Sequence, residues 1–216
     1  MVRDHSKAKN AKVEKSKGTS RSKKREETSA RIVQAARQSF AKRGFHGTST
    51  RDIASEAGTN QGLITYHFGT KDALWRAAAD NLFEEIGGRL FDRLGHRQLT
   101  DERENARESI REFVRFSAEH PEFFWLMVDE GKNADERLDW LITTHLRPRF
   151  EVLADYMLNE LGYSQTELPH VYYTLAGAAS LIFAVAPECR QLTGVDPLKQ
   201  EIVERHADFV ARLLIA

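Results

Sequence analysis

The chain has 216 residues, of which 41% are hydrophobic and 30% charged, and its one cysteine excludes an intrachain disulfide. No apolar stretch reaches the roughly 20 residues of a membrane-spanning helix, and the N-terminal residues lack the apolar core of a signal peptide, so we expect a cytoplasmic protein with no membrane partner. The net charge is zero, yet residues 1–76 carry 17 Lys and Arg against 7 Asp and Glu, whereas residues 77–216 carry 15 against 25.

The basic part of the chain begins with a segment rich in Lys, Ser and Thr. Residues 1–24 contain almost no apolar side chains that could be buried, which predicts a disordered basic arm. Such an arm can attract DNA phosphates of any sequence, or it can be a solvated tail without a role. A basic tail on a neutral enzyme would show the same uneven charge, so charge alone leaves the function open.

Beyond the arm the apolar residues recur at helical spacing, with no convincing strand pattern and no internal repeat. The first helix is expected from about residue 27 to 43, where Gly44 ends it. A short helix follows over about 50–57, capped by Ser49 or Thr50 and stopped by Gly58. The next is expected over about 60–67 with Asn60 as its cap, and a long fourth helix over about 71–94.

The remainder is typical of a helical bundle. Pro187 and Pro197 are expected to bracket a loop near its end. The predicted fold class is therefore all-α, with three N-terminal helices joined through a long helix to a helical-bundle C-terminal domain. The expected helices of the bundle are 102–118, 121–131, 134–147, 148–161, 166–186 and 197–215.

Residues 49–68 have the pattern of a helix-turn-helix. Two short helices that cross steeply need a small residue at their contact, which Ala54 supplies, and a turn residue that tolerates positive φ, which Gly58 supplies. They also need apolar side chains facing inward, which the sequence provides at Ile53, Ala57 and Ile64.

The sequence resembles the TetR/AcrR family of regulators over about residues 25–85. The densest match is in Thr-Ser-Thr-Arg-Asp-Ile-Ala-Ser-Glu-Ala-Gly and in Tyr-His-Phe-Gly-Thr-Lys-Asp-Ala-Leu. The resemblance implies a helix-turn-helix DNA-binding domain over 25–85 and a ligand-binding and dimerisation domain over 86–216.

The same resemblance implies that the third helix enters the major groove. Gln61, Gly62 and Thr65 would face base edges, although many family members carry Tyr where Thr65 stands. Their chemistry agrees, because Gln can bond adenine, a Thr methyl can contact thymine, and Gly lets the backbone approach closely. The residues implied for phosphate contacts are Thr50, Arg51, Tyr66, His67 and Lys71.

Aromatic and methionine side chains are dense in the C-terminal part. Singly they are typical of a core, but as a group they can line an apolar ligand pocket. The candidates for the pocket are Phe113, Phe116, Phe124, Trp125, Met127, Trp140, His145, Phe150 and Tyr172. The polar candidates for orienting a ligand are Glu130, Asn133, His145, Arg147 and Arg149.

The last two helices of the bundle are the expected dimer interface, as the family resemblance implies. The alternative is that both helices lie inside one subunit. A dimer also suits DNA, because two recognition helices about 34 Å apart read successive major grooves. The expected interface residues are Leu175, Ala178, Ala179, Ile182, Ile202, His206, Phe209 and Leu213.

These patterns predict a homodimeric transcription repressor that binds a palindromic operator on the nucleoid and is released by a small apolar or aromatic effector. A ligand-dependent activator, a sequence-neutral DNA-binding protein and a small-molecule enzyme are the alternatives. No catalytic residue, cofactor or metal is expected, since the sequence shows no nucleophile–base pair, phosphate loop or metal-ligand spacing.

Overall fold

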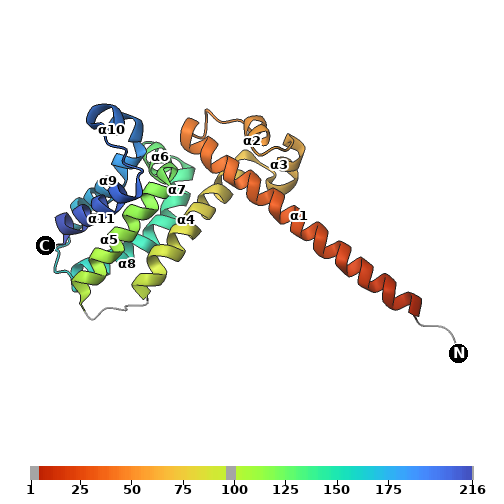
Figure 1. The fold of residues 1–216 in the computed structure, drawn as a ribbon, viewed down its shortest axis with the longest axis horizontal. Coiled ribbons are helices and arrows are strands. Elements are labelled where there is room, and N and C mark those ends of the chain that lie inside the picture. Colours follow the sequence, from red (N-terminus) through yellow and green to blue (C-terminus); the bar gives the residue numbers. More distant parts are fainter. Residues whose placement is uncertain (1–4, 96–100, 216) are drawn as a thin grey trace. The chain divides into compact units, whose positions relative to one another are not determined.

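A computed structural model describes residues 5–95 and 101–215, with side chains over 22–87 and 101–215. Every regular element among these residues is helical, which confirms the all-α prediction (Figure 1). The chain divides into an N-terminal unit up to Ala78 and a C-terminal unit from Ala79, whereas the sequence placed the boundary after residue 85. The helices are α1 His5–Arg43, α2 Thr50–Glu56, α3 Gln61–Phe68, α4 Lys71–Gly95, α5 Glu102–Glu119, α6 Pro121–Glu130, α7 Glu136–Leu141, the π-helix η1 Ile142–Leu146, α8 Arg147–Asn159, α9 Leu168–Ala184, α10 Ala186–Thr193 and α11 Gln200–Leu214.

Helix α1 begins at His5, in the segment that the sequence predicts as a disordered arm. The prediction rested on the lack of apolar side chains, which prevents a segment from forming a core. A single helix satisfies its backbone hydrogen bonds within itself, and this segment contains no proline to interrupt them. Residues 1–4 of the predicted arm lie outside the described residues.

The core of the N-terminal unit joins α1 to the two short helices and the start of α4. Ile32, Ala36 and Phe40 of α1 are almost fully buried. A polar link accompanies them, because the carboxylate of Glu56 on α2 accepts a hydrogen bond from the Ser39 hydroxyl at 2.5 Å. The other buried apolar residues of this unit are Ala35, Ile53, Ala54, Ala57, Ile64, Leu74, Trp75 and Ala78.

The core of the C-terminal unit lies among α5, α9 and α11, which pack side by side with α8 contributing Tyr156 (Figure 1). The arginines of α5 add a charged layer at its edge, where the guanidinium of Arg115 donates to both carboxylate oxygens of Glu204 on α11. The buried apolar members are Ala106, Ile110, Val114, Tyr156, Ala179, Phe183, Val203, Ala207, Val210, Ala211 and Ile215.

Two local predictions in the C-terminal unit were wrong. The loop expected between Pro187 and Pro197 is largely helix α10, because Pro187 occupies the first turn, where no N–H is needed, and Gly194 ends the helix at φ 73°. The single helix expected over 134–147 is divided into α7 and η1. Pro148 follows, and its missing N–H removes the α-type bond to residue 144, which favours a π turn there.

Within the described ranges no single helix is long and apolar enough to cross a bilayer. Only α9 and α10 taken together meet the criteria of length and composition, and they are bent by 73° at their junction.

Candidate functional site

Side chains fix where α2 and α3 begin. The Ser49 hydroxyl accepts from the Asp52 backbone N–H at 3.1 Å, and the Asp52 carboxylate accepts from the Ser49 backbone N–H at 3.3 Å, forming a capping box. The Ser49 hydrogen bond also lowers the pKa of the Asp52 carboxyl, so the cap stays charged. At α3 the Asn60 side chain accepts from the Leu63 N–H at 3.0 Å. The sequence therefore places both caps correctly, with Ser49 and not Thr50 capping α2.

The turn between the two helices is made by Gly58. Its φ of 61° is in the left-handed region, which an L-residue adopts only at a cost. The reversal lets the N–H of Thr59 bond back to the Ala54 carbonyl at 2.9 Å, closing the end of α2. Ala54 is 3% exposed and Ile64 on α3 is 2% exposed, so the two helices meet through a small and a branched apolar residue.

The outer side of α3 carries the three residues expected to read bases. Gln61, Gly62 and Thr65 are all exposed. The Gln61 side-chain amide donates to the Thr50 hydroxyl at 3.0 Å, so it is held at the α2–α3 junction with its amide oxygen still available to a donor. An added Cβ at Gly62 would lie 3.2 Å from the Asn60 side-chain oxygen, so a larger residue would press on the α3 cap.

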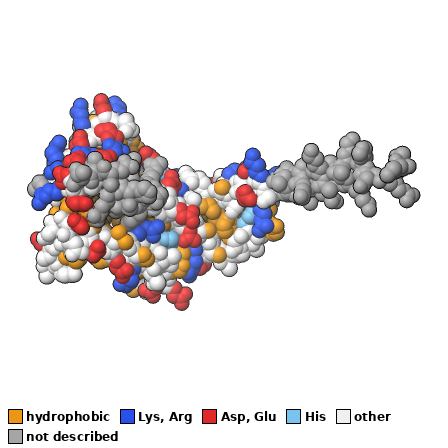
Figure 2. Space-filling view, turned by 90° about the horizontal axis from the view of Figure 1, so that it is seen from below, with side chains coloured by type: hydrophobic (Ala, Val, Ile, Leu, Met, Phe, Trp, Pro, Cys, Tyr) orange, Lys and Arg blue, Asp and Glu red, His pale blue; other side chains and the backbone are white. Residues whose placement is uncertain are grey.

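The five residues expected to hold phosphates surround this face. Tyr66 is 65% exposed, and the Arg25 guanidinium of α1 lies 5.4 Å from its ring centre. The Lys71 ammonium lies 4.4 Å from the ring centre of Phe45, so its stem is anchored at the start of α4. Figure 2 shows Lys and Arg side chains beside hydrophobic ones on the surface of the N-terminal unit. Arg51 and Tyr66 are exposed, and Thr50, His67 and Lys71 are half-buried.

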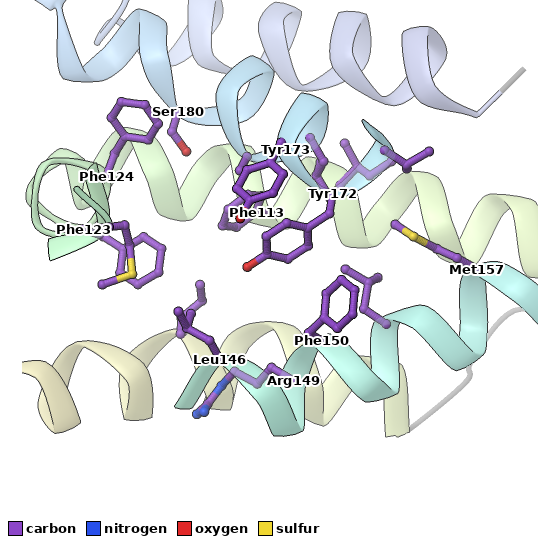
Figure 3. A pocket seen from close by; sticks show the side chains of 18 of the residues that line it. Phe113, Phe123, Phe124, Leu146, Arg149, Phe150, Met157, Tyr172, Tyr173 and Ser180 are labelled. Carbon is purple, nitrogen blue, oxygen red and sulfur yellow. The ribbon is translucent and has the colours of Figure 1, made fainter. Parts of the chain in front are cut away.

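The C-terminal unit contains a cavity of about 590 Å³, a volume typical of sites for drug-sized ligands. Its wall is formed by α4, α5, α6, α8 and α9, with smaller parts from α7, η1 and the chain end (Figure 3). The wall is mostly apolar, and its large side chains include Phe83, Phe113, Phe123, Phe124, Met127, Phe150, Tyr156, Met157, Tyr172 and Tyr173.

Comparison with known proteins finds a match within the N-terminal unit. Residues 32–78 match the family model of bacterial regulatory proteins of the tetR family. This segment of the chain is therefore similar to the tetR family.

Two relatives match a short part of the chain. The HTH-type transcriptional repressor Rv3405c of Mycobacterium tuberculosis is 53% identical over 58 residues, and the HTH-type transcriptional regulator TtgR of Pseudomonas putida is 44% identical over 59. Each alignment covers 27% of this chain, but only 31% of Rv3405c and 28% of TtgR. The chain thus matches less than a third of the length of these relatives.

Solved structures extend the similarity of fold to nearly the whole chain. The fatty acid degradation regulator FadR from Bacillus halodurans aligns with a TM-score of 0.65 and 19% identity, covering 88% of this chain and 95% of that one. FadR from Bacillus subtilis, solved in complex with stearoyl-CoA, aligns at 0.62 and 16%, covering 87% and 97%. At these identities the likeness shows that the chain shares the fold of these structures and nothing more.

The cavity of the C-terminal unit includes five of the nine predicted pocket residues, namely Phe113, Phe124, Met127, Phe150 and Tyr172. Phe116 does not line it, because its ring is 1% exposed between Phe123 and His120 in the packed interior. Trp125 is also turned away, and its indole N–H donates to the Ala184 carbonyl at 3.1 Å.

Trp140 and His145 do not line the cavity either. The imidazole of His145 stacks on Phe83 at 4.3 Å between ring centres, and Trp140 contacts the imidazole edge-on. The Nε2 atom of His145 lies 2.8 Å from the Asp80 carboxylate. Burial lowers the pKa of His145, although Asp80 opposes this effect. Helical spacing located these aromatic residues but could not tell which side of each helix borders the cavity. Phe83 was missed because it lies on α4, outside the cluster that the sequence highlighted.

Only some of the polar candidates for orienting a ligand line the cavity. Glu130 and Arg149 line the cavity, whereas Asn133 and Arg147 are exposed elsewhere. The Arg149 guanidinium donates to the His145 carbonyl at 2.9 Å and to the Phe83 carbonyl at 3.1 Å, which ties α8 to α4. Burial lowers the pKa of Arg149 from its very high ordinary value. Within the described part of the chain, no group of three or more His, Cys, Asp or Glu could hold a metal ion.

The residues expected at the dimer interface divide into inner and outer sets. Ala179 is fully buried in the core of its own chain, so its assignment to an interface is wrong. His206 is directed inward as well, since its Nε2–H donates to the Ala178 carbonyl at 2.8 Å. Leu175, Ala178 and Ile182 pack partly against the same core, and Ile202 is half-buried. Phe209 and Leu213 are 55% and 58% exposed, and Leu181, which was not predicted, is 50% exposed.

Proposed function

We propose that this chain is a dimeric, sequence-specific DNA-binding regulator, a repressor that a small molecule releases from its operator. The observation that carries the proposal is the outward face of α3. Gln61, Gly62 and Thr65 are exposed together on a helix whose position is fixed by the Gly58 turn and the Asn60 cap. Side chains so placed can reach base edges in a major groove.

The proposed effector site is the cavity of the C-terminal unit, and α4 connects it to the DNA-binding domain along the chain. Phe83 of α4 borders the cavity, and its carbonyl is bonded to Arg149 of α8, which also lines it. A ligand that repacks Phe83 would change how α4 is held, and α4 begins at Lys71 beside the proposed DNA contacts. Coupling of this kind needs only a ligand with different affinities for two states. The stearoyl-CoA complex of the Bacillus subtilis FadR supports a ligand in this fold.

A second copy of the chain would supply the other recognition helix. The exposed apolar residues Leu181, Phe209 and Leu213 lie on α9 and α11, and their area would be buried in a dimer. A symmetric dimer would read a palindromic operator.

The proposal is tested by selecting duplexes from a random pool with the purified chain and then measuring affinity for the selected site and for scrambled ones. Gln61→Ala is expected to cost about 1–3 kcal/mol on the selected site and little on scrambled DNA, since it removes a base contact. Gln34→Ala, at an exposed position on α1, is the matched control. Equal losses on all sequences would contradict base readout by Gln61.

Lys71→Ala is expected to weaken binding to every sequence alike and to lower the salt slope by about one unit, because it removes a phosphate contact. Lys42→Ala removes an exposed lysine of α1 that has no proposed DNA contact, so it serves as the control. If no duplex is selected over the pool, the regulatory proposal fails. Transcription from the selected operator then distinguishes a repressor from an activator.

A further inference from the structure

Charged side chains at the rim and wall of the cavity already have partners in the protein. Glu130 is 1% exposed, and its Oε2 accepts a hydrogen bond from the Arg137 guanidinium at 3.1 Å. Burial raises the pKa of this carboxyl even though Arg137 opposes the rise. The Lys132 ammonium lies 3.2 Å from the Asp129 carboxylate in an exposed position. Neither side chain leaves an uncompensated charge for a ligand.

Arg149 is the third charged residue of the wall. Its guanidinium is held by the carbonyls of His145 and Phe83, and it lies 5.1 Å from the ring centre of Phe83 (Figure 3). Withdrawing it toward a ligand would break two buried hydrogen bonds. A charged ligand would therefore lose its hydration, and it could reach an opposite charge only by breaking hydrogen bonds within the protein.

Tyr172 is the polar group that faces the cavity. Its ring is fixed by edge-on contacts with Phe150, at 5.3 Å between ring centres, and with Tyr173, at 5.2 Å. Figure 3 shows its hydroxyl pointing into the space between α8 and α9. No hydrogen-bond partner for this hydroxyl lies within the described ranges. Burial raises the pKa of Tyr172, so the phenol is protonated and can donate at neutral pH.

Most other hydroxyls around the cavity are already used, and Tyr173, which also lines it, is 73% exposed. The Tyr156 hydroxyl donates to the Glu102 carbonyl at 2.6 Å, and the Tyr163 hydroxyl donates to the Leu214 carbonyl at 2.9 Å. The Ser180 hydroxyl shares a hydrogen bond with Ser117 at 3.0 Å. These bonds join elements of the fold, whereas the Tyr172 hydroxyl joins nothing.

We propose that the cavity takes an uncharged, largely apolar molecule with one hydrogen-bond acceptor, such as a ketone, ester or ether oxygen, and that the Tyr172 hydroxyl donates to it. This specificity rests on the proposed function only in that the bound molecule would be the effector. The apolar wall supplies affinity, and the Tyr172 phenol selects the position of the acceptor along the ligand.

The test is isothermal titration calorimetry of the whole chain, without DNA, against four ten-carbon probes at neutral pH. They are 2-decanone, which is uncharged with one acceptor; decanoate, an anion; decylammonium, a cation; and butylbenzene, which has no such acceptor. We expect 2-decanone to bind at least about ten-fold more tightly than either charged probe. Tyr172→Phe should weaken 2-decanone by about 2- to 12-fold, the contribution of one neutral hydrogen bond. It should leave butylbenzene unchanged, which also shows that the cavity of the variant is intact.

Tighter binding of decanoate or decylammonium than of 2-decanone would overturn the proposal in favour of a charged ligand. Equal affinity of native and Tyr172→Phe proteins for 2-decanone would contradict a hydrogen bond from the Tyr172 phenol to the ligand. Failure of all four probes to bind would contradict the assignment of the cavity as a ligand site. Because no DNA is present, these failures are separate from failure of the regulatory proposal, which the duplex selection decides.

Discussion

Gly58→Ala tests the turn on which presentation of α3 depends. At φ 61° an L-residue is strained by about 1–2 kcal/mol. An added Cβ would meet no atom within 4 Å, so no steric clash adds to this strain. Alanine also restricts the unfolded chain, which offsets about 0.4–1 kcal/mol. The expected net loss in the free energy of unfolding is therefore about 1 kcal/mol.

Urea denaturation measures the total loss, and amide hydrogen exchange locates it. Exchange should accelerate about five-fold over residues 49–68, as expected for about 1 kcal/mol of local destabilisation. Gly58→Asn should lose less than Gly58→Ala, since asparagine tolerates the left-handed region better. Gly194→Ala is the matched control, because Gly194 has φ 73° and equally open surroundings but ends α10 in the C-terminal unit.

Operator affinity of Gly58→Ala, measured well below its melting temperature, should stay within about three-fold of the native value, because open space lets the backbone keep its conformation. An unchanged free energy of unfolding would refute the left-handed turn in solution. A loss above about 3 kcal/mol in the free energy of unfolding would contradict the absence of a steric clash at Gly58, on which the expected magnitude depends.

Two further outcomes follow from particular contacts. The Ser39 hydrogen bond and then Arg43 lower the pKa of the Glu56 carboxyl below its ordinary 4.5. Its contribution to stability is therefore present above that value and lost as the pH falls through the lowered pKa. Glu56→Gln should cost about 1 kcal/mol or less at pH 7 and reduce this acid dependence in urea titrations, whereas an unaltered pH profile would contradict the assignment. Phe209→Glu places a charge on the exposed face of α11 without entering the core and should give a monomer by light scattering. Leu192→Glu, at a 79% exposed site on α10, should remain dimeric, and a dimeric Phe209→Glu would exclude α11 from the interface.

The helix-turn-helix could be predicted closely because its determinants are local. The side chains of Ser49 and Asn60 cap helices by accepting from backbone N–H groups three residues further along, and Gly58 meets a backbone requirement of its own position. Such interactions depend on spacing along the chain, so residue order specifies them. The sequence likewise distinguished helices from strands, since the 3.6-residue apolar period persists almost throughout.

The cavity wall and the outer face of the bundle were decided by tertiary packing. Aromatic residues at helical spacing give the same pattern in the sequence whatever they contact. In the structure Trp125 donates to the Ala184 carbonyl and Phe113 borders the cavity, because the neighbouring helices determine what each ring contacts. Ala179 and Phe209 were assigned to the same interface, but one is in the core and the other is exposed. Hydrophobicity along the chain measures the tendency of a residue to be buried, and only the packed structure decides whether its own chain, a ligand or a second copy buries it.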